Sequence, residues 1–109
     1  MPQIGWKKVR DFRDLTRIVT CQLWIPDYAV KVRTLELWWR ADMVFVLALN
    51  QAVAGVSVYD PLCCYIPGRW THSPSGIDLE MSGTFARGLH YCLRREVVEM
   101  LQARECGEF

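Results

Sequence analysis

The spacing of apolar residues in the first part of the chain predicts one strand followed by two helices. The strand is expected over residues 4–9. Residues 10–24 are expected to be helical because apolar residues recur there every three or four positions, as on one face of a helix. Pro26 ends this helix, since proline removes a backbone donor and clashes with the preceding turn. A second helix is expected over residues 27–40. The apolar positions are Ile4, Trp6 and Val9 in the strand, Phe12, Leu15, Ile18, Val19 and Leu23 in the first helix, and Tyr28, Val32, Leu35 and Trp39 in the second.

An uncharged run of seventeen residues, over positions 43–59, predicts a buried hairpin. Residues 43–49 are apolar at odd and even positions alike, as in a strand covered on both faces. Asn50 and Gln51 supply the turn, and residues 52–59 return as the partner strand. A membrane-spanning helix needs about 20 apolar residues. Because this run is shorter and polar residues interrupt it, no transmembrane segment is predicted.

The remaining part of the chain adds a loop, a strand and a helix. Prolines and glycines make residues 60–76 irregular. Alternation in "GIDLEM", residues 76–81, predicts a fourth strand. Residues 82–101 are expected to begin as a tight loop and to continue as a third helix. The order β-α-α-β-β-β-α predicts a single α+β domain over residues 1–109. In that domain about three helices pack against a mainly antiparallel four-stranded sheet.

The charge balance excludes functions that depend on a strongly basic or acidic surface. The 13 Lys and Arg residues against 12 Asp and Glu residues leave a net charge of +1. That value gives no bulk attraction to nucleic acid or to an anionic membrane. A local excess of basic residues near the start is interpreted as a solvated helix face, with a phosphate or RNA contact as the alternative. These residues are Lys7, Lys8, Arg10, Arg13 and Arg17.

The five cysteines predict reduced thiols rather than a disulfide framework. Their number is odd and no secretory signal opens the chain, so a cytosolic rather than a secreted location is expected. Structural zinc sites usually pair their ligands as Cys-x2-4-Cys, and the spacing here does not match that pattern. No metal site is therefore predicted among Cys63, Cys64, His72, His90 and Cys92.

Two stretches of the chain carry a resemblance to a known family. "MVFVLALNQAVAGVSVYD" resembles the central hairpin of the GNAT-type N-acyltransferases. "IDLEMSGTFARGLHYCLRREVVEMLQARECG" resembles their fourth strand, pyrophosphate loop and third helix. The sequence stops before the family's fifth strand, so the likeness covers the first two-thirds of that fold. It implies a shortened GNAT-like domain.

The resemblance also implies which residues a coenzyme would meet. Arg87 and Gly88 fall on the Arg-Gly that begins the loop, whose amides and helix N-terminus hold the acetyl-CoA pyrophosphate in the family. His90 stands at the next small position and places an imidazole where the family has bare backbone. Glu80 takes the place of the carboxylate base, and Asp78 lies two residues earlier on the same face. The alternative for these two acids is a solvated strand face.

A narrower likeness concerns the stretch "MSGTFARGLHYCLRR". It is similar to the loop of small GNAT-like internal virion proteins of T7-like bacteriophages. The expected function is therefore that of a non-catalytic structural or protein-interaction protein, in the cytoplasm or in a virion, with no cofactor. The alternative is an acetyl-CoA-dependent N-acyltransferase that a partner chain completes.

Two tryptophans are the candidate interface residues. Trp38 and Trp39 cannot both lie at the centre of one helical stripe, so Trp38 is expected at its edge or against another chain. Trp70, in the irregular loop, is the second candidate. The open edge of the fourth strand and the Trp38 region are expected to pair with a second copy or with another protein. A nucleic-acid partner is not expected.

Overall fold

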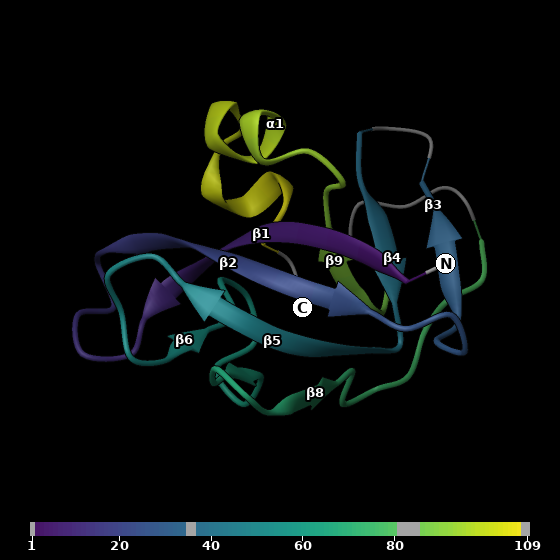
Figure 1. The fold of residues 1–109 in the computed structure, drawn as a ribbon, viewed down its shortest axis with the longest axis horizontal. Coiled ribbons are helices and arrows are strands. Elements are labelled where there is room, and N and C mark those ends of the chain that lie inside the picture. The colour runs from purple at the N-terminus through teal and green to yellow at the C-terminus, as the bar shows by residue number, and fades with distance from the viewer. Residues whose placement is uncertain (1, 35–36, 81–85, 108–109) are drawn as a thin grey trace.

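The computed structural model describes residues 2–34, 37–80 and 86–107, and it has a mainly antiparallel β fold with one short α-helix (Figure 1). The strands are β1 (Gln3–Asp11), β2 (Ile18–Ile25), β3 (Lys31–Arg33), β4 (Trp39–Ala41), β5 (Met43–Leu49), β6 (Gly55–Val56), β7 (Cys64–Tyr65), β8 (Trp70–His72) and β9 (Leu89–Tyr91). Near the C-terminus follow the α-helix α1 (Arg95–Met100) and the 3-10 helix η1 (Ala103–Glu105).

The strands form two antiparallel sheets. The larger sheet has six strands in the order β7-β6-β1-β2-β5-β8, and the smaller has three in the order β3-β4-β9. A bridge between Trp6 and Cys92 connects them, because each residue donates its backbone N–H to the other's carbonyl at 2.8 Å. The long strand β1 is therefore shared between the main sheet and the end of β9.

The larger sheet curls so that its two edge strands approach each other. β7 and β8 are consecutive in the chain and are joined by the turn Ile66–Arg69. The Thr71 hydroxyl in β8 donates to the carbonyl of Cys64 in β7 at 2.8 Å. No ladder joins these two strands in the described part of the chain. The sheet is thus an incomplete barrel with a seam between β7 and β8.

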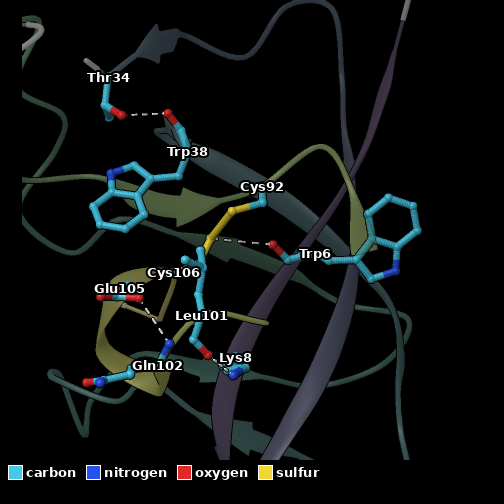
Figure 2. Close-up of a disulfide and its surroundings, with 9 residues drawn as sticks. All are labelled: Trp6, Lys8, Thr34, Trp38, Cys92, Leu101, Gln102, Glu105 and Cys106. Atoms are coloured by element: carbon cyan, nitrogen blue, oxygen red, sulfur yellow. Dashed lines mark hydrogen bonds between the residues drawn. A yellow bond between two sulfur atoms is a disulfide. The ribbon is translucent and has the colours of Figure 1, made fainter. Parts of the chain in front are cut away.

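Two separate cores fill the molecule. The larger lies inside the curled sheet and includes the buried polar side chain of Lys7, whose ammonium donates to the Tyr65 hydroxyl at 2.6 Å. The smaller core lies beneath α1, where the sulfurs of Cys92 and Cys106 form a disulfide (Figure 2). The buried residues of the larger core are Val9, Val19, Cys21, Leu23, Ile25, Ala29, Ala41, Val44, Val46, Cys63, Tyr65, Leu89 and Tyr91; those of the smaller are Trp38, Cys92, Val98 and Cys106.

The prediction of a GNAT-like α+β domain is wrong. The described chain contains one α-helix of six residues and one 3-10 turn, whereas the resemblance implied about three helices packed on a four-stranded sheet. The order β-α-α that opens such a domain is absent from the described ranges, because the strands β2, β3 and β4 stand where the two helices were expected. The likeness to acyltransferases and to GNAT-like phage virion proteins is wrong for the same reason.

The first predicted helix, over residues 10–24, is a strand. In β2, Val19, Cys21, Leu23 and Ile25 are buried, while the residues between them are half-buried. This period of two is that of a sheet with one covered face, and the β-branched residues of "IVT" favour extended backbone. The prediction was wrong because it weighted three- and four-residue spacing over this alternation.

The second predicted helix, over residues 27–40, is replaced by β3 and β4. These strands pair with Val32 opposite Arg40, and β4 also pairs with β9, where Arg40 lies opposite His90. The pairing with β9 joins segments that are far apart in the sequence. Local apolar spacing carries no information about such a partner, which explains the error.

The strand predicted over residues 43–49 is confirmed as β5, but the predicted hairpin is wrong. β5 pairs with β2 and β8, whereas β6 pairs with β1 and β7. Gly55 permits the pairing of β6 with β1, because a Cβ at this position would collide with the side chain of Val9. The internal glycine thus marks a close approach, although with a strand other than the expected one.

The last two predicted elements also differ. Residues 76–80 form no strand, and residues 81–85 lie outside the described ranges. In the described part of residues 82–101, β9 and the much shorter α1 stand where a loop followed by a long helix was predicted. No helix of the described chain is long and apolar enough to cross a membrane.

Candidate functional site

A groove runs along the seam between β7 and β8. It has a volume of about 300 Å³, and several large apolar side chains are exposed along it. Leu62 is 85% exposed, Trp70 is 40% exposed and Ile66 is 39% exposed. Such a gathering of exposed apolar side chains is typical of an interaction site rather than of an ordinary surface. The lining residues are Leu62, Cys63, Cys64, Ile66, Arg69, Trp70, Thr71 and His72.

The turn at the closed end of the groove is fixed by its sequence. In Ile66–Arg69, Pro67 takes the second position and Gly68 the third with φ of +81°, as in a type II turn. The Arg69 N–H donates to the Ile66 carbonyl at 3.1 Å. The Gly68 N–H also donates to the Val46 carbonyl at 2.8 Å, and the Val46 N–H donates to the Arg69 carbonyl at 3.0 Å. The turn is therefore attached to β5, so β8 pairs with β5 and not with β7.

The backbone of β8 offers an edge to the groove. Ser73 donates to the Asp42 carbonyl at 2.8 Å, and the Arg69 carbonyl accepts from Val46. In an antiparallel ladder, alternate residues direct their backbone groups to opposite sides. Since residues 69 and 73 bond toward β5, Trp70 and His72 direct their N–H and C=O groups toward the seam.

The backbone of β7 has the same arrangement on the opposite wall. The Cys63 carbonyl accepts from the Ser57 N–H at 2.9 Å, which places residue 63 on the β6 side of the ladder. Cys64 therefore directs its backbone groups to the seam, where its carbonyl accepts the Thr71 hydroxyl. A side-chain contact thus takes the place that a backbone ladder would occupy in a closed barrel.

An aromatic row on the outer face of the sheet ends at this groove. Ile4, Trp24, Phe45 and Trp70 lie directly opposite one another on β1, β2, β5 and β8. The Phe45 and Trp70 ring centres are 5.2 Å apart, and those of Trp24 and Trp70 are 5.8 Å apart. Tyr28, which is 69% exposed, adds a fourth ring at 6.5 Å from Trp70.

The rings of this row are inclined to one another. The interplanar angles are 69° for Phe45 and Trp70 and 84° for Trp24 and Phe45. A platform for nucleic-acid bases needs ring faces that are open for stacking, whereas edge-to-face rings pack on each other. The row is therefore a packed apolar support that holds Trp70 in place beside the groove.

In the described residues, the lining of the groove carries one formal charge, that of Arg69, which is exposed beside His72. The carboxylate of Asp60 lies outside the lining, where its Oδ1 accepts the Leu62 N–H at 3.0 Å. Burial raises the pKa of the Cys63 thiol, and nearby Lys7 only partly opposes that shift. A buried, protonated thiol is a poor nucleophile. The groove therefore offers apolar contacts, open backbone groups and a positive rim.

The two predicted interface tryptophans lie in different environments. Trp70 lines the groove and is partly exposed. Trp38 is 6% exposed and belongs to the smaller core, where its ring lies edge-to-face on His90 at 5.9 Å. Its carbonyl accepts the Thr34 hydroxyl at 2.7 Å (Figure 2). Trp38 thus stabilises the joint between β4 and β9 within the chain.

The residues assigned to a pyrophosphate loop do not precede a helix. Gly88 has φ of +139° and leads into β9, in which His90 is fully buried. The Arg87 guanidinium donates to Asp78 at 2.8 Å, and this bond holds the pKa of the Asp78 carboxyl below its ordinary value. Glu80 is exposed. Because a strand stands where the helix N-terminus was expected, Arg87, Gly88 and His90 form no cradle of the family's kind.

Arg40 is an organising residue that sequence reasoning missed. Its side chain is fully buried in β4, and its guanidinium donates to the carbonyls of Asp78 at 2.5 Å and of Arg87 at 3.1 Å. It also donates to the Glu80 carbonyl. These hydrogen bonds attach Asp78, Glu80 and Arg87, which lie between β8 and β9, to β4. The signal in the sequence was an arginine with apolar residues on both sides, in "LWWRA".

The cysteines and histidines form no metal centre in the described residues, where no group of three or more His, Cys, Asp or Glu side chains could hold an ion. The expectation that all thiols are reduced is corrected by the Cys92–Cys106 disulfide. The three other cysteines carry free thiols, with Cys21 and Cys63 buried and Cys64 exposed.

The groove residues other than Trp70 escaped the sequence analysis as a site. They come from two strands of two and three residues, from the turn between them and from the two residues that precede β7. The one available signal was the dense sequence of apolar residues and proline in "PLCCYIPGRW". Comparison of the chain with protein-family models, with curated proteins and with solved structures finds no match.

Proposed function

We propose that this chain is a non-catalytic protein-interaction domain whose β7–β8 groove receives an extended segment of a partner protein. The observation that carries the proposal is the seam itself. Strands β7 and β8 both direct backbone groups toward the groove, and a hydrogen bond from the Thr71 side chain to the Cys64 carbonyl bridges them. An added strand would meet those groups with a ladder of hydrogen bonds, which is the mode called β-augmentation.

The side chains of the groove define the class of partner. Leu62, Ile66 and Trp70 favour apolar residues in the bound segment. Arg69 on the rim, with no carboxylate among the described lining residues, favours an acidic residue beside it. The expected ligand is therefore an extended apolar segment that carries at least one carboxylate.

The state of three groups in and beside the groove supports a non-catalytic role. The Thr71 hydroxyl donates to a backbone carbonyl, so no base withdraws its proton. The Cys63 thiol is buried and its pKa is raised. Tyr65, whose hydroxyl contacts that thiol at 3.6 Å, also has a raised pKa, chiefly because of burial. These groups are suited to packing rather than to proton transfer near neutral pH.

Selection of binders from a displayed library of linear peptides tests the proposal. The selected peptides should share apolar residues at alternate positions and an acidic residue. Trp70→Ala should weaken the best peptide about 30-fold or more, as for a central interface residue. Arg69→Glu should reverse the preference for the acidic position.

Leu62→Ala and Met100→Ala provide a matched pair for this test. The two side chains are almost equally exposed, at 85% and 84%, but only Leu62 lines the groove. Leu62→Ala should weaken peptide binding, and Met100→Ala should leave it unchanged. If no peptide is selected, or if the selected peptides bind Trp70→Ala as tightly as the parent, the groove is not the binding site.

A further inference from the structure

A second hollow lies on the outer face of the sheet beside α1. Its volume is about 240 Å³, and it shares no lining residue with the β7–β8 groove. Its polar lining consists of Thr20, Gln22, Asn50 and Arg95. Trp6, Ala48 and Leu49 form its apolar wall. Strands β1, β2 and β5 thus supply its floor, and α1 supplies one side.

A β-bulge produces this hollow. Gln22 lies opposite Ala48 and Leu23 lies opposite Val46, so Leu47 is an extra residue in β5. Bulges re-aim side chains and are frequent beside functional sites. Here the bulge directs both Leu47 and Ala48 to the exposed face. Because the side chain of Ala48 is a single methyl group, the surface of the sheet is recessed at this point.

The strands place the polar groups around the hollow. Gln22 lies directly opposite Trp6 in the β1–β2 ladder. Asn50 is fixed at the end of β5, where its backbone N–H donates to the Thr20 carbonyl at 3.0 Å. The two amide side chains each bring donors and an acceptor, and the Thr20 hydroxyl can do either. Such groups suit a ligand with several hydroxyls.

The charge of the hollow is nearly balanced. The Arg95 guanidinium donates to the Glu99 carboxylate at 3.0 Å, one turn later in α1. This ion pair offsets the positive charge that would otherwise recruit a phosphate or a carboxylate. A neutral ligand therefore fits the site better than an anion does.

We propose that this hollow binds one neutral sugar ring. Its hydroxyls would meet the amides of Gln22 and Asn50, and its less polar face would lie on the apolar wall formed by Trp6. The volume is below the roughly 300 Å³ at which pockets for drug-sized molecules begin, which suits a single ring. Such a small ligand in an open site should bind with a dissociation constant of about a millimolar.

Titration of the ¹⁵N-labelled protein with glycosides tests the proposal by NMR. The probes are the methyl glycosides of glucose, galactose, mannose and N-acetylglucosamine, which represent a terminal glycan residue, and the corresponding free sugars. At least one should shift the Trp6 indole N–H and the Gln22 and Asn50 side-chain amide signals. If only the free sugars bind, the ligand is a monosaccharide and not a glycan.

Ala48→Phe fills the hollow at an exposed position and should weaken the best sugar about 10-fold or more. Gln22→Ala should weaken it several-fold. Val53→Phe is the control, since Val53 is 55% exposed and lies outside the hollow. Ala48→Phe should leave peptide binding in the β7–β8 groove unchanged, so the two proposals fail separately.

Three results would overturn the inference. The first is the absence of signal shifts up to 50 millimolar of every sugar, about fifty times the expected dissociation constant. The second is unchanged sugar binding by Ala48→Phe. The third is a response of the same signals to acetate or inorganic phosphate at lower concentration than to any sugar, which would indicate an anion site.

Discussion

The two cores of this protein each contain a pair of buried cysteines, but they hold them in opposite states. In the larger core, Cys21 and Cys63 are free thiols among the side chains of the curled sheet. In the smaller core, Cys92 and Cys106 form a disulfide between the end of β9 and the C-terminal segment. Because the residue is the same in both cores, the difference between free thiols and a disulfide reflects how each core is held together.

The larger core is closed by long ladders. β1 and β2 pair over eight residue pairs, and β2 continues into β5. The smaller core has four buried side chains and is covered by α1, a helix of six residues. So short a helix has little stability of its own. The disulfide therefore holds this cover in place, whereas strand ladders and packing hold the larger core.

Leu23→Ala in β2 should have the largest effect on stability. Leu23 is fully buried in the larger core, and such truncations cost about 2–5 kcal/mol through lost burial and a residual cavity. Urea unfolding should show a lower midpoint with the whole domain melting together. A cost below about 1 kcal/mol would mean that the barrel core is not the main source of stability.

Leu15→Ala is the control for that measurement. Leu15 is 55% exposed in the turn between β1 and β2. Its truncation should change the free energy of unfolding by less than about 0.5 kcal/mol. The same chemical change would thus separate the buried position from the exposed one.

Loss of the disulfide in the Cys92→Ser, Cys106→Ser double variant should have the next largest effect. The link closes a loop with a sequence separation of 14 residues, for which the chain-entropy estimate is about 3 kcal/mol. Hydrogen exchange should show that the amides of α1 and η1 become exposed first, while those of β1 and β2 stay protected.

The pattern of exchange decides whether the two cores are separable. If the double variant loses protection equally in β2 and in α1, the smaller core is part of one cooperative unit with the barrel. Equal protection in the variant and the parent would show that packing of Val98 and Trp38 suffices without the covalent link.

Some strands of this protein could be predicted from the sequence, and others could not. β5 was predicted because residues 43–49 are apolar at every position, and no helical stripe competes there. β2 was missed because Ile18, Val19 and Leu23 also fit a helical spacing. The period-two set that includes Cys21 and Ile25 was equally present. Single-sequence patterns do not weigh the long antiparallel partner that settles this choice.

The candidate groove shows a second limit of sequence reasoning. Trp70 was named as an interface residue from its type and its place in a loop. The groove itself depends on β7 and β8 being neighbours without a ladder, which follows from the attachment of the Ile66–Arg69 turn to β5. Such an arrangement is a property of tertiary pairing and leaves no local signature.

The smallest predicted effect concerns the thiols of the larger core at high pH. Burial raises the pKa of Cys21 from 9.0 to about 12, and nearby Lys7 only partly opposes this. Above pH 9 the unfolded chain loses this proton while the folded chain keeps it. The unfolded state then binds fewer protons, so stability falls as pH rises toward the folded pKa. Between pH 9 and pH 10 the loss due to this thiol should be about 1 kcal/mol.

Cys21→Ala isolates this contribution, because Cys63 and Tyr65 also have raised pKa values and remain in the variant. Urea unfolding at pH 8, 9 and 10 should give a smaller loss of stability in Cys21→Ala than in the parent, whereas Cys64→Ala should match the parent. The disulfide cysteines have no thiol to titrate, so the double serine variant should keep the parental slope if it unfolds as a whole. Equal slopes in the parent and in Cys21→Ala would mean that water reaches the barrel interior.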